Sequence, residues 1–314
     1  MTQALSAFVG AELDRPAQAA VAAFAADLAR LGGAASASVL FYGSALRTGA
    51  LDGVLDFYVL MDRLPAWPQP RMAAAAGAVL PPNVEYREFE VGGRTLRAKV
   101  AILGAGQFRR LARGESLDTS VWARFAQPAG LVWARDDAAR AEAVAAVGEA
   151  AATAARWAAL LGPEAGPAEA FWNALFRETY AAELRVEPKG RERAILDASA
   201  ERWTRLLPLA WEAAGLSFER DGDALSPRLS PRLGEAGRRD GRRAWAARRR
   251  LGKPLTVLRL AKAVFTFQGA ADYAAWKIER HTGVKIEVTP WKRRHPILAS
   301  PGVAWTLWKA GVLR

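Results

Sequence analysis

The sequence predicts an α+β fold in which a mixed-sheet domain is followed by a mostly helical region. Up to residue 103, short runs rich in Val, Leu, Phe and Tyr alternate with Gly and Pro turns. From residue 108 onward, apolar residues recur three or four positions apart in alanine-rich stretches. A chain of 314 residues, 51% of them hydrophobic, is long enough for two cores. We expect a sheet domain at 1–135, a helical domain at 136–220, a basic low-complexity linker at 221–254 and a C-terminal segment at 255–314.

The first half should begin with a helix, because its apolar residues have helical spacing and it stops at a Gly-Gly pair. Two apolar strands then flank a Gly-Ser turn, and a run of prolines breaks the chain before a short helix. A second Gly-Gly pair between two strand-like runs predicts a hairpin. The expected elements are a helix at 17–31, strands at 39–42 and 54–60, a helix at 71–79, and strands at 84–91 and 95–103.

The second half should contain three helices, at 136–161, 168–183 and 191–214. The segment 221–254 then repeats Ser-Pro-Arg and carries a dense run of arginines. This composition is typical of a solvated linker or helix, and equally of a segment that docks on an anionic surface. The last sixty residues mix tryptophan with lysine and arginine, which fits either a tryptophan-rich core with basic edges or contact with a membrane surface.

The overall charge and the rare residue types restrict the chemistry. The net charge of +12 favours a polyanionic partner such as nucleic acid, anionic lipid or a phosphorylated substrate. There is no cysteine and only two histidines, so a metal would have to be held by carboxylates, which favours Mg²⁺ or Mn²⁺ over zinc. Residues 1–10 do not resemble a signal peptide, and no uncharged apolar run is long enough to span a membrane.

The most informative motif is the Gly-Ser turn followed by an acid on the next strand. Gly43 and Ser44 end one apolar strand, and Asp56 lies inside the following one. A small-residue turn lets backbone N–H groups approach phosphate oxygens, and a carboxylate on a neighbouring strand can hold Mg²⁺. This arrangement indicates a nucleotidyltransferase, with Asp52 in the connecting loop as a second metal ligand. The alternative is an ordinary hairpin, and the first acid of the usual acidic pair is replaced by Val54.

These residues resemble the mitochondrial-type CDP-diacylglycerol synthases, the peripheral phosphatidate cytidylyltransferases also described as translocator-maintenance proteins. That family shares a Tyr-Gly-Ser turn and a Leu-Asp-Phe strand, and it also lacks the first acid of the pair. Weaker similarities follow in the same order along the chain. They involve Lys99, Arg124 to Pro128, Tyr180 to Arg185, Lys262, Thr266, Tyr273 and Lys277. The chain departs from the family at Glu183, where aspartate is usual, after Lys262, where glycine is missing, and in its long basic insert.

The resemblance implies a nucleotidyltransferase-like domain joined to a helical, winged-helix-like domain. It also implies CTP and Mg²⁺ (or Mn²⁺) as ligands and phosphatidic acid or another lipid phosphate as acceptor. Asp56, Lys99 and Lys262 would be catalytic, and Asp56 and Asp52 would hold the metal. Tyr42, Gly43, Ser44 and Arg124 would bind the nucleotide, and Arg185 and Lys277 the lipid phosphate. Glu88, Glu90 and Asp118 are further candidate metal ligands.

The leading hypothesis is therefore transfer of CMP from CTP to a lipid phosphate by a cytoplasmic protein attached peripherally to the inner face of the membrane. The C-terminal segment would pack on both the active site and the membrane. A related hypothesis keeps the chemistry but uses another lipid phosphate, such as a ceramide phosphate. Two others are nucleotide transfer to protein, RNA or a small molecule, and a degenerate domain that binds nucleic acid through its arginines. Nucleic acid is the less favoured partner.

Overall fold

The computed structural model describes residues 1–182, 196, 199–222 and 227–309. The main sheet has five strands in the order β3-β4-β2-β1-β5, with β2 and β4 parallel and the other neighbours antiparallel. The strands are β1 (Ser36–Tyr42), β2 (Val54–Met61), β3 (Asn83–Val91), β4 (Arg94–Gly104) and β5 (Ala129–Ala134). The four predicted strands are confirmed, and β5 was missed.

Alternate residues of these strands enter two different cores. On one face, Phe41, Phe57 and Val100 pack with Phe24 and Leu28 of α2 (Ala19–Gly32). On the other face, the intervening residues of the same strands pack against helices, among them Leu40, Tyr58 and Leu60 of β1 and β2. This is the period of two expected for strands buried on both faces.

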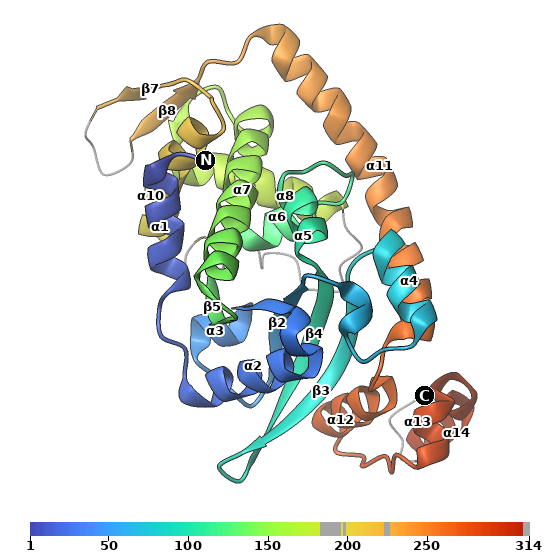
Figure 1. Cartoon of the computed structure of the whole chain (residues 1–314). Coiled ribbons are helices and arrows are strands. Elements are labelled where there is room, and N and C mark those ends of the chain that lie inside the picture. The colour runs from blue at the N-terminus through green and yellow to red at the C-terminus, as the bar shows by residue number, and fades with distance from the viewer. Residues whose placement is uncertain (183–195, 197–198, 223–226, 310–314) are drawn as a thin grey trace.

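The helices above the second face surround α7 (Asp137–Leu161) (Figure 1). Their apolar core is continuous with that face of the sheet and extends across the predicted boundary at residue 135. α7 is also the one helix among the described residues that is long and apolar enough to cross a membrane, and 67% of its apolar window is buried. It therefore serves as a core helix. The helices that pack on α7 include α1 (Gln3–Leu13), α5 (Ala105–Ala112), α6 (Ser120–Phe125), α8 (Ala168–Ala182) and α10 (Ala200–Ala213).

The predicted low-complexity linker at 221–254 has regular structure over most of its described part. A small antiparallel sheet, in the order β6-β8-β7, precedes α11 (Glu235–Thr266), a helix of 32 residues. The first half of α11 carries exposed arginines, as expected if the basic segment is a solvated helix. α11 is nonetheless anchored, because Trp245 is buried and a Cβ on Gly252 would overlap with the carbonyl oxygen of Ala182 in α8. The strands are β6 (Gly166–Pro167), β7 (Phe218–Asp221) and β8 (Arg228–Pro231).

The remaining elements lie around the edges of the two cores. α4 runs beside the second half of α11, and α12 follows α11 at the β3–β4 side of the sheet (Figure 1). These elements are α3 (Ser44–Thr48), α4 (Arg71–Val79), α12 (Ala270–Thr282), α13 (Pro290–Arg294), α14 (Pro296–Lys309) and two short 3-10 helices at Gly33–Ala35 and Leu64–Ala66. The architecture confirms the predicted α+β class.

Candidate functional site

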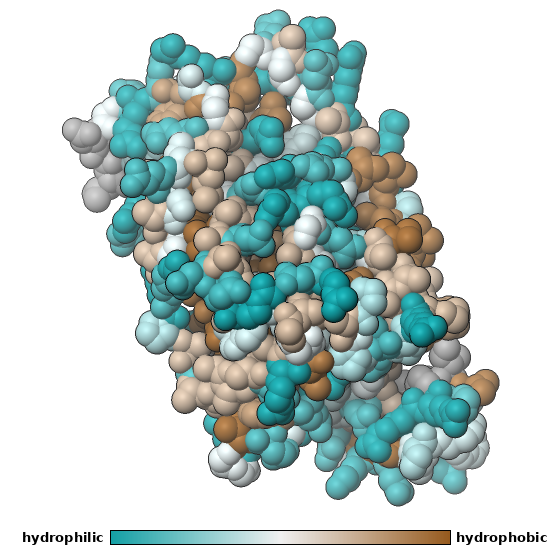
Figure 2. Space-filling view, in the orientation of Figure 1, coloured by the Kyte–Doolittle hydropathy of each residue, from teal (hydrophilic) through white to brown (hydrophobic). Residues whose placement is uncertain are grey.

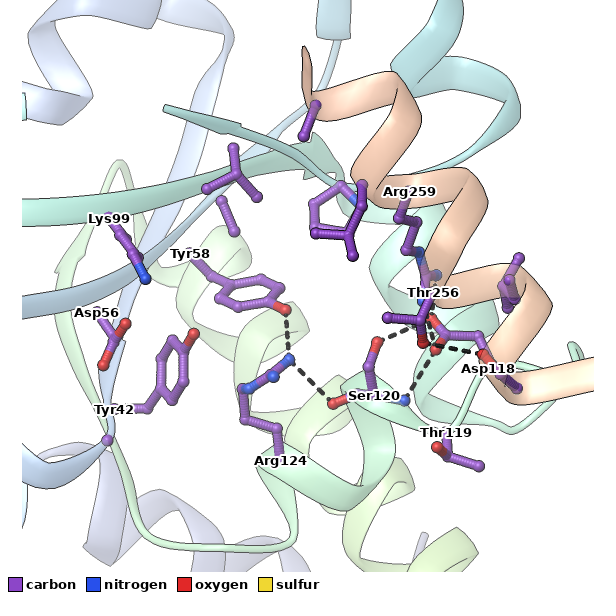
Figure 3. Close-up of a pocket in the computed structure, with 18 of the residues that line it drawn as sticks. Tyr42, Asp56, Tyr58, Lys99, Asp118, Thr119, Ser120, Arg124, Thr256 and Arg259 are labelled. Carbon is purple, nitrogen blue, oxygen red and sulfur yellow. Dashed lines mark hydrogen bonds and ion pairs between the residues drawn. The ribbon is translucent and has the colours of Figure 1, made fainter. Parts of the chain in front are cut away.

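A cavity of about 650 Å³ lies between the main sheet and α11 (Figure 3). The walls come from the β1–α3 turn, β2, β4, the α5–α6 connection, α6, α11 and Tyr273 of α12. The cavity brings together seven of the residues that the sequence predicted for the site: Tyr42, Gly43, Ser44, Asp56, Lys99, Arg124 and Lys262.

Strand register places three of these residues in one row across the sheet. Tyr42 of β1 is the antiparallel partner of Asp56, and Asp56 is the parallel partner of Lys99. Paired residues in a sheet project from the same face. This is the face that carries Tyr58 and packs against the helices, so the carboxylate is presented to the cavity although its sequence neighbours Leu55 and Phe57 are buried on the other side.

The turn after β1 lies against the carboxylate of Asp56. Gly43 has φ +92°, a conformation that glycine adopts readily and other residues do not. A Cβ on Gly43 would lie 2.7 Å from Oδ2 of Asp56, so the absence of a side chain allows the close approach. Ser44, which begins α3, follows directly and also lines the cavity. The predicted turn and acid are thus one structural unit.

Arg124 reaches the cavity from α6. Its Nη1 donates to the hydroxyl of Tyr58 at 2.9 Å and to the carbonyl of Ser120 at 3.2 Å, and the guanidinium lies 5.3 Å from the ring centroid of Tyr42 (Figure 3). Burial raises the pKa of Tyr58, and the charge of Arg124 only partly opposes this shift. The phenol therefore stays neutral and holds the guanidinium beside the row of strand residues.

Lys99 is held from the other side by α12. Its ammonium lies 4.7 Å from the ring centroid of Tyr273, a favourable cation–π distance. Tyr273 also packs against Tyr86 of β3, which joins α12 to the edge of the sheet. Lys277 lies 5.9 Å from the same ring and is not among the described residues that line the cavity.

Lys262 lines the cavity, but its contacts indicate a structural role. Its ammonium donates to the carbonyl oxygens of Leu80 and Pro82, both at 2.6 Å, and to Oδ1 of Asn83 at 2.9 Å. An ammonium has three donors, so these acceptors use all of them. Burial, together with the charge of Arg259, lowers the pKa of Lys262 to about 8. In this structure Lys262 therefore anchors α11 to the α4–β3 connection, and its catalytic role stays a prediction.

The two lysines should respond differently to loss of the amine. Lys262→Met leaves three acceptors without their donor and is expected to lower the free energy of unfolding by about 1–3 kcal/mol. Lys99→Met should leave thermal stability nearly unchanged, because the contact of its ammonium with the described residues is with the ring of Tyr273. If the nucleotidyltransferase hypothesis holds, this variant should lower turnover strongly. Thermal unfolding and initial rates measured on both variants check this. The assignment is wrong if Lys262→Met is inactive at full stability.

Asp52 lies outside the described lining of the cavity. Its carboxylate is 82% exposed and lies 3.6 Å from Arg94, while its carbonyl accepts from Arg280. Arg185 lies outside the described residues. Within the described part of the chain, no group of three or more Asp, Glu or His side chains could hold a metal. Mg²⁺ often uses one or two carboxylates together with substrate phosphates, and Asp56 fits that donor set.

Sequence reasoning did not find the ion pair that closes the far end of the cavity. Arg259 of α11 binds both carboxylate oxygens of Asp118, at 2.8 and 2.5 Å, and Ser120 donates to the same carboxylate through its N–H and hydroxyl (Figure 3). These partners make Asp118 a positioning residue rather than a metal ligand. The pair joins positions 141 apart in sequence, and no local pattern signals it.

This pair should make stability depend on pH. Burial raises the pKa of Asp118, but hydrogen bonds and charge from Arg259, with help from Ser120, lower it overall. A carboxyl with a depressed pKa stabilises the fold above its unfolded pKa of about 4, and this stabilisation is lost as the pH falls through the folded value. Asp118→Asn should remove that part of the acid dependence and cost about 3–5 kcal/mol, because the half-buried guanidinium of Arg259 loses the carboxylate that neutralises it. Denaturant titrations from neutral to acid pH test both effects; an unchanged acid limb would contradict them.

Among the described residues, the charged side chains that line the cavity are mostly basic. Six of these are cationic (Arg47, Lys99, Arg124, Arg248, Arg259 and Lys262) and two are anionic (Asp56 and Asp118). Since Arg259 neutralises Asp118, positive charge remains in excess around Asp56. Apolar side chains of α11 and the α5–α6 connection, Leu255, Leu260 and Leu117, form another wall. The cavity is therefore suited to a ligand with several negative charges and an apolar part.

Comparison with known proteins adds no assignment. No protein-family model matches this chain, and no curated protein sequence matches it either.

Proposed function

We propose that the protein is a nucleotidyltransferase that transfers CMP from CTP to a lipid phosphate, with phosphatidic acid as the first acceptor to test. The observation that carries the proposal is the contact between the Gly43 turn and the Asp56 carboxylate inside a cationic cavity. The choice of CTP rests on the resemblance of the Tyr42-Gly43-Ser44 turn and the Asp56 strand to the phosphatidate cytidylyltransferases. The protein would act as a peripheral protein at the cytoplasmic face of the membrane.

In the proposed reaction, an oxygen of the acceptor phosphate attacks the α-phosphorus of CTP. The new P–O bond gives a CDP-lipid, and the bond to the leaving pyrophosphate breaks. A phosphate acceptor is already an anion at neutral pH, so no general base is required. Asp56 would hold Mg²⁺ or Mn²⁺, which supplies charge neutralisation on the triphosphate when bound. Ser44 and the Gly43 backbone would orient the triphosphate, and Lys99 and Arg124 would stabilise charge on the phosphates.

The apolar wall supports a lipid rather than a small polar acceptor. Leu255 and Leu260 of α11 and Leu117 face the same space as Asp56. Leu117 and Leu260 are also exposed, at 39% and 55%, so the apolar wall continues to the outside of the protein. A phosphate group could enter toward the cations while its acyl chains remain against leucine side chains.

The test is product formation from CTP labelled at the α-phosphate, with Mg²⁺ and phosphatidic acid in mixed micelles. The proposal predicts label in an organic-soluble CDP-lipid and release of one pyrophosphate for each product formed. Parallel reactions with ceramide phosphate and with water-soluble phosphates identify the acceptor class, and the other three nucleoside triphosphates test base selection. Absence of transfer to every lipid phosphate would contradict the proposal.

A further inference from the structure

The outward face of α11 divides into a cationic half and an apolar half. In the first half, arginine side chains are exposed; these are Arg239, Arg242, Arg243, Arg249 and Arg250. From Val257 to Phe265 the exposed side chains are apolar, and Phe265 is 85% exposed. We call the second set the α11 ridge, which consists of Val257, Leu258, Leu260, Val264 and Phe265 together with Met72 and Val79 of the adjacent α4. Figure 2 shows hydrophilic side chains over the beginning of α11 and hydrophobic ones further along it.

This exposure is concentrated rather than scattered. Of the fourteen large apolar side chains exposed on the described residues, eight lie on α4 and α11. Single exposed apolar residues are ordinary, whereas a contiguous group marks an interaction surface. The ridge is not a consequence of a loosely attached helix, because Arg259 and Lys262 on the inward side of the same turns are tied to Asp118 and Asn83.

The ridge is continuous with the cavity. Leu260 belongs to the ridge and also lines the cavity, and Leu255 and Ala263 of the same helix line it from within. The α11 helix is therefore the wall between the exposed apolar surface and the space that holds Asp56. An amphiphile that contacts the ridge would reach the cavity along one helix.

We propose that the outward face of α11 binds an anionic bilayer. The ridge would lie among the acyl chains, and the exposed arginines of the first half of the helix would lie at the headgroups. Interfacial helices combine an apolar surface with arginines or lysines in this way, and anionic lipid attracts the cationic half. Charge disfavours a second copy of the chain as the occupant, since it would bring an equally cationic face. The consequence for the reaction rests on the proposed function: the lipid phosphate would pass directly from the bilayer into the cavity along α11.

The experiment is flotation of the full chain with vesicles of phosphatidylcholine alone or mixed with phosphatidylglycerol. Leu258→Asp/Phe265→Asp removes the ridge, and Arg239→Ala/Arg243→Ala/Arg250→Ala removes cationic charge. Trp305→Ser/Trp308→Ser is the matched control, because both tryptophans are 56% exposed on α14. All the substituted side chains are exposed, and circular dichroism verifies that each variant folds.

Wild type should float with mixed vesicles and much less with pure phosphatidylcholine. The ridge variant should lose most binding, the arginine variant should bind about a hundredfold more weakly, and the α14 variant should bind like wild type. Loss of binding only in the α14 variant would overturn the proposal. The proposal is also overturned if the wild-type protein does not bind the mixed vesicles, whether it dimerises through the ridge or binds RNA instead.

A water-soluble short-chain lipid phosphate separates this proposal from the proposed function. The ridge variant should convert this acceptor at the wild-type rate and lose activity only when the acceptor is embedded in vesicles. Equal losses with both acceptors would contradict the bilayer proposal. If wild type converts neither acceptor, the proposed function fails, and flotation still decides whether α11 binds the bilayer.

Discussion

Asp56→Asn is expected to reduce nucleotidyl transfer by at least about a thousandfold. The substitution keeps the shape of the side chain but removes the charge that would hold a divalent cation, and several kcal/mol of charge stabilisation are lost, at about 1.4 kcal/mol for each factor of ten. Initial rates with saturating CTP and Mg²⁺ measure the loss. Thermal stability should change little, since the carboxylate faces the cavity.

The matched control is Asp52→Asn. This residue was predicted from sequence to be a second metal ligand, but its carboxylate is 82% exposed beside Arg94. It should retain activity within about twofold of wild type, as expected for an exposed ion pair of little energetic weight. A large loss at Asp52 together with full activity of Asp56→Asn would show that the metal lies elsewhere.

Gly43→Ala is expected to have the second largest effect. The new Cβ would lie 2.7 Å from Oδ2 of Asp56, and the residue would have to keep φ +92°. Either the turn or the carboxylate must move, and displacements of this size in a catalytic site can cost about a hundredfold in rate. The strained backbone should also lower the free energy of unfolding by about 1–3 kcal/mol.

Gly49→Ala separates strain from displacement of the carboxylate. Gly49 has φ +71° and ψ +1°, the left-handed helical conformation, which alanine adopts at a smaller cost than the conformation of Gly43, with φ +92° and ψ −162°. The nearest atom to a Cβ on Gly49 would be Nε2 of Gln18 at 3.5 Å. We expect Gly49→Ala to lose less stability than Gly43→Ala and to keep nearly normal turnover, measured by chemical denaturation and initial rates. If both variants lose activity equally, the contact between Gly43 and Asp56 has no specific role.

The strands and the central row of the site were predictable because they follow local rules. Apolar runs bounded by Gly and Pro turns identified the strands, and the Gly-Ser turn next to an apolar strand with an internal acid indicated that Gly43 and Asp56 belong together. Lys99 came from resemblance alone, and the structure places it beside Asp56 through the parallel pairing of β2 and β4. Such pairing has no sequence signal of its own.

The contacts of α11 could not be predicted, because they join segments distant in sequence. Lys262 binds acceptors about 180 residues earlier in the chain, and Arg259 binds Asp118. Composition of the C-terminal segment was also ambiguous. Trp276 packs against the guanidinium groups of Arg97 and Arg280. The tryptophan-rich segment thus has an anchoring side as well as the exposed tryptophans of α14.

The central claim is that Asp56 and the Gly43 turn form a site for a metal-bound nucleoside triphosphate. The most direct measurement is a crystal structure with Mn²⁺ and a non-hydrolysable CTP analogue, read from the anomalous signal of the metal. We predict a manganese peak beside the Asp56 carboxylate, with phosphate density at Gly43 and Ser44 and the acceptor space open toward α11. Nucleotide bound elsewhere, or a metal site without Asp56 among its ligands, would contradict the claim.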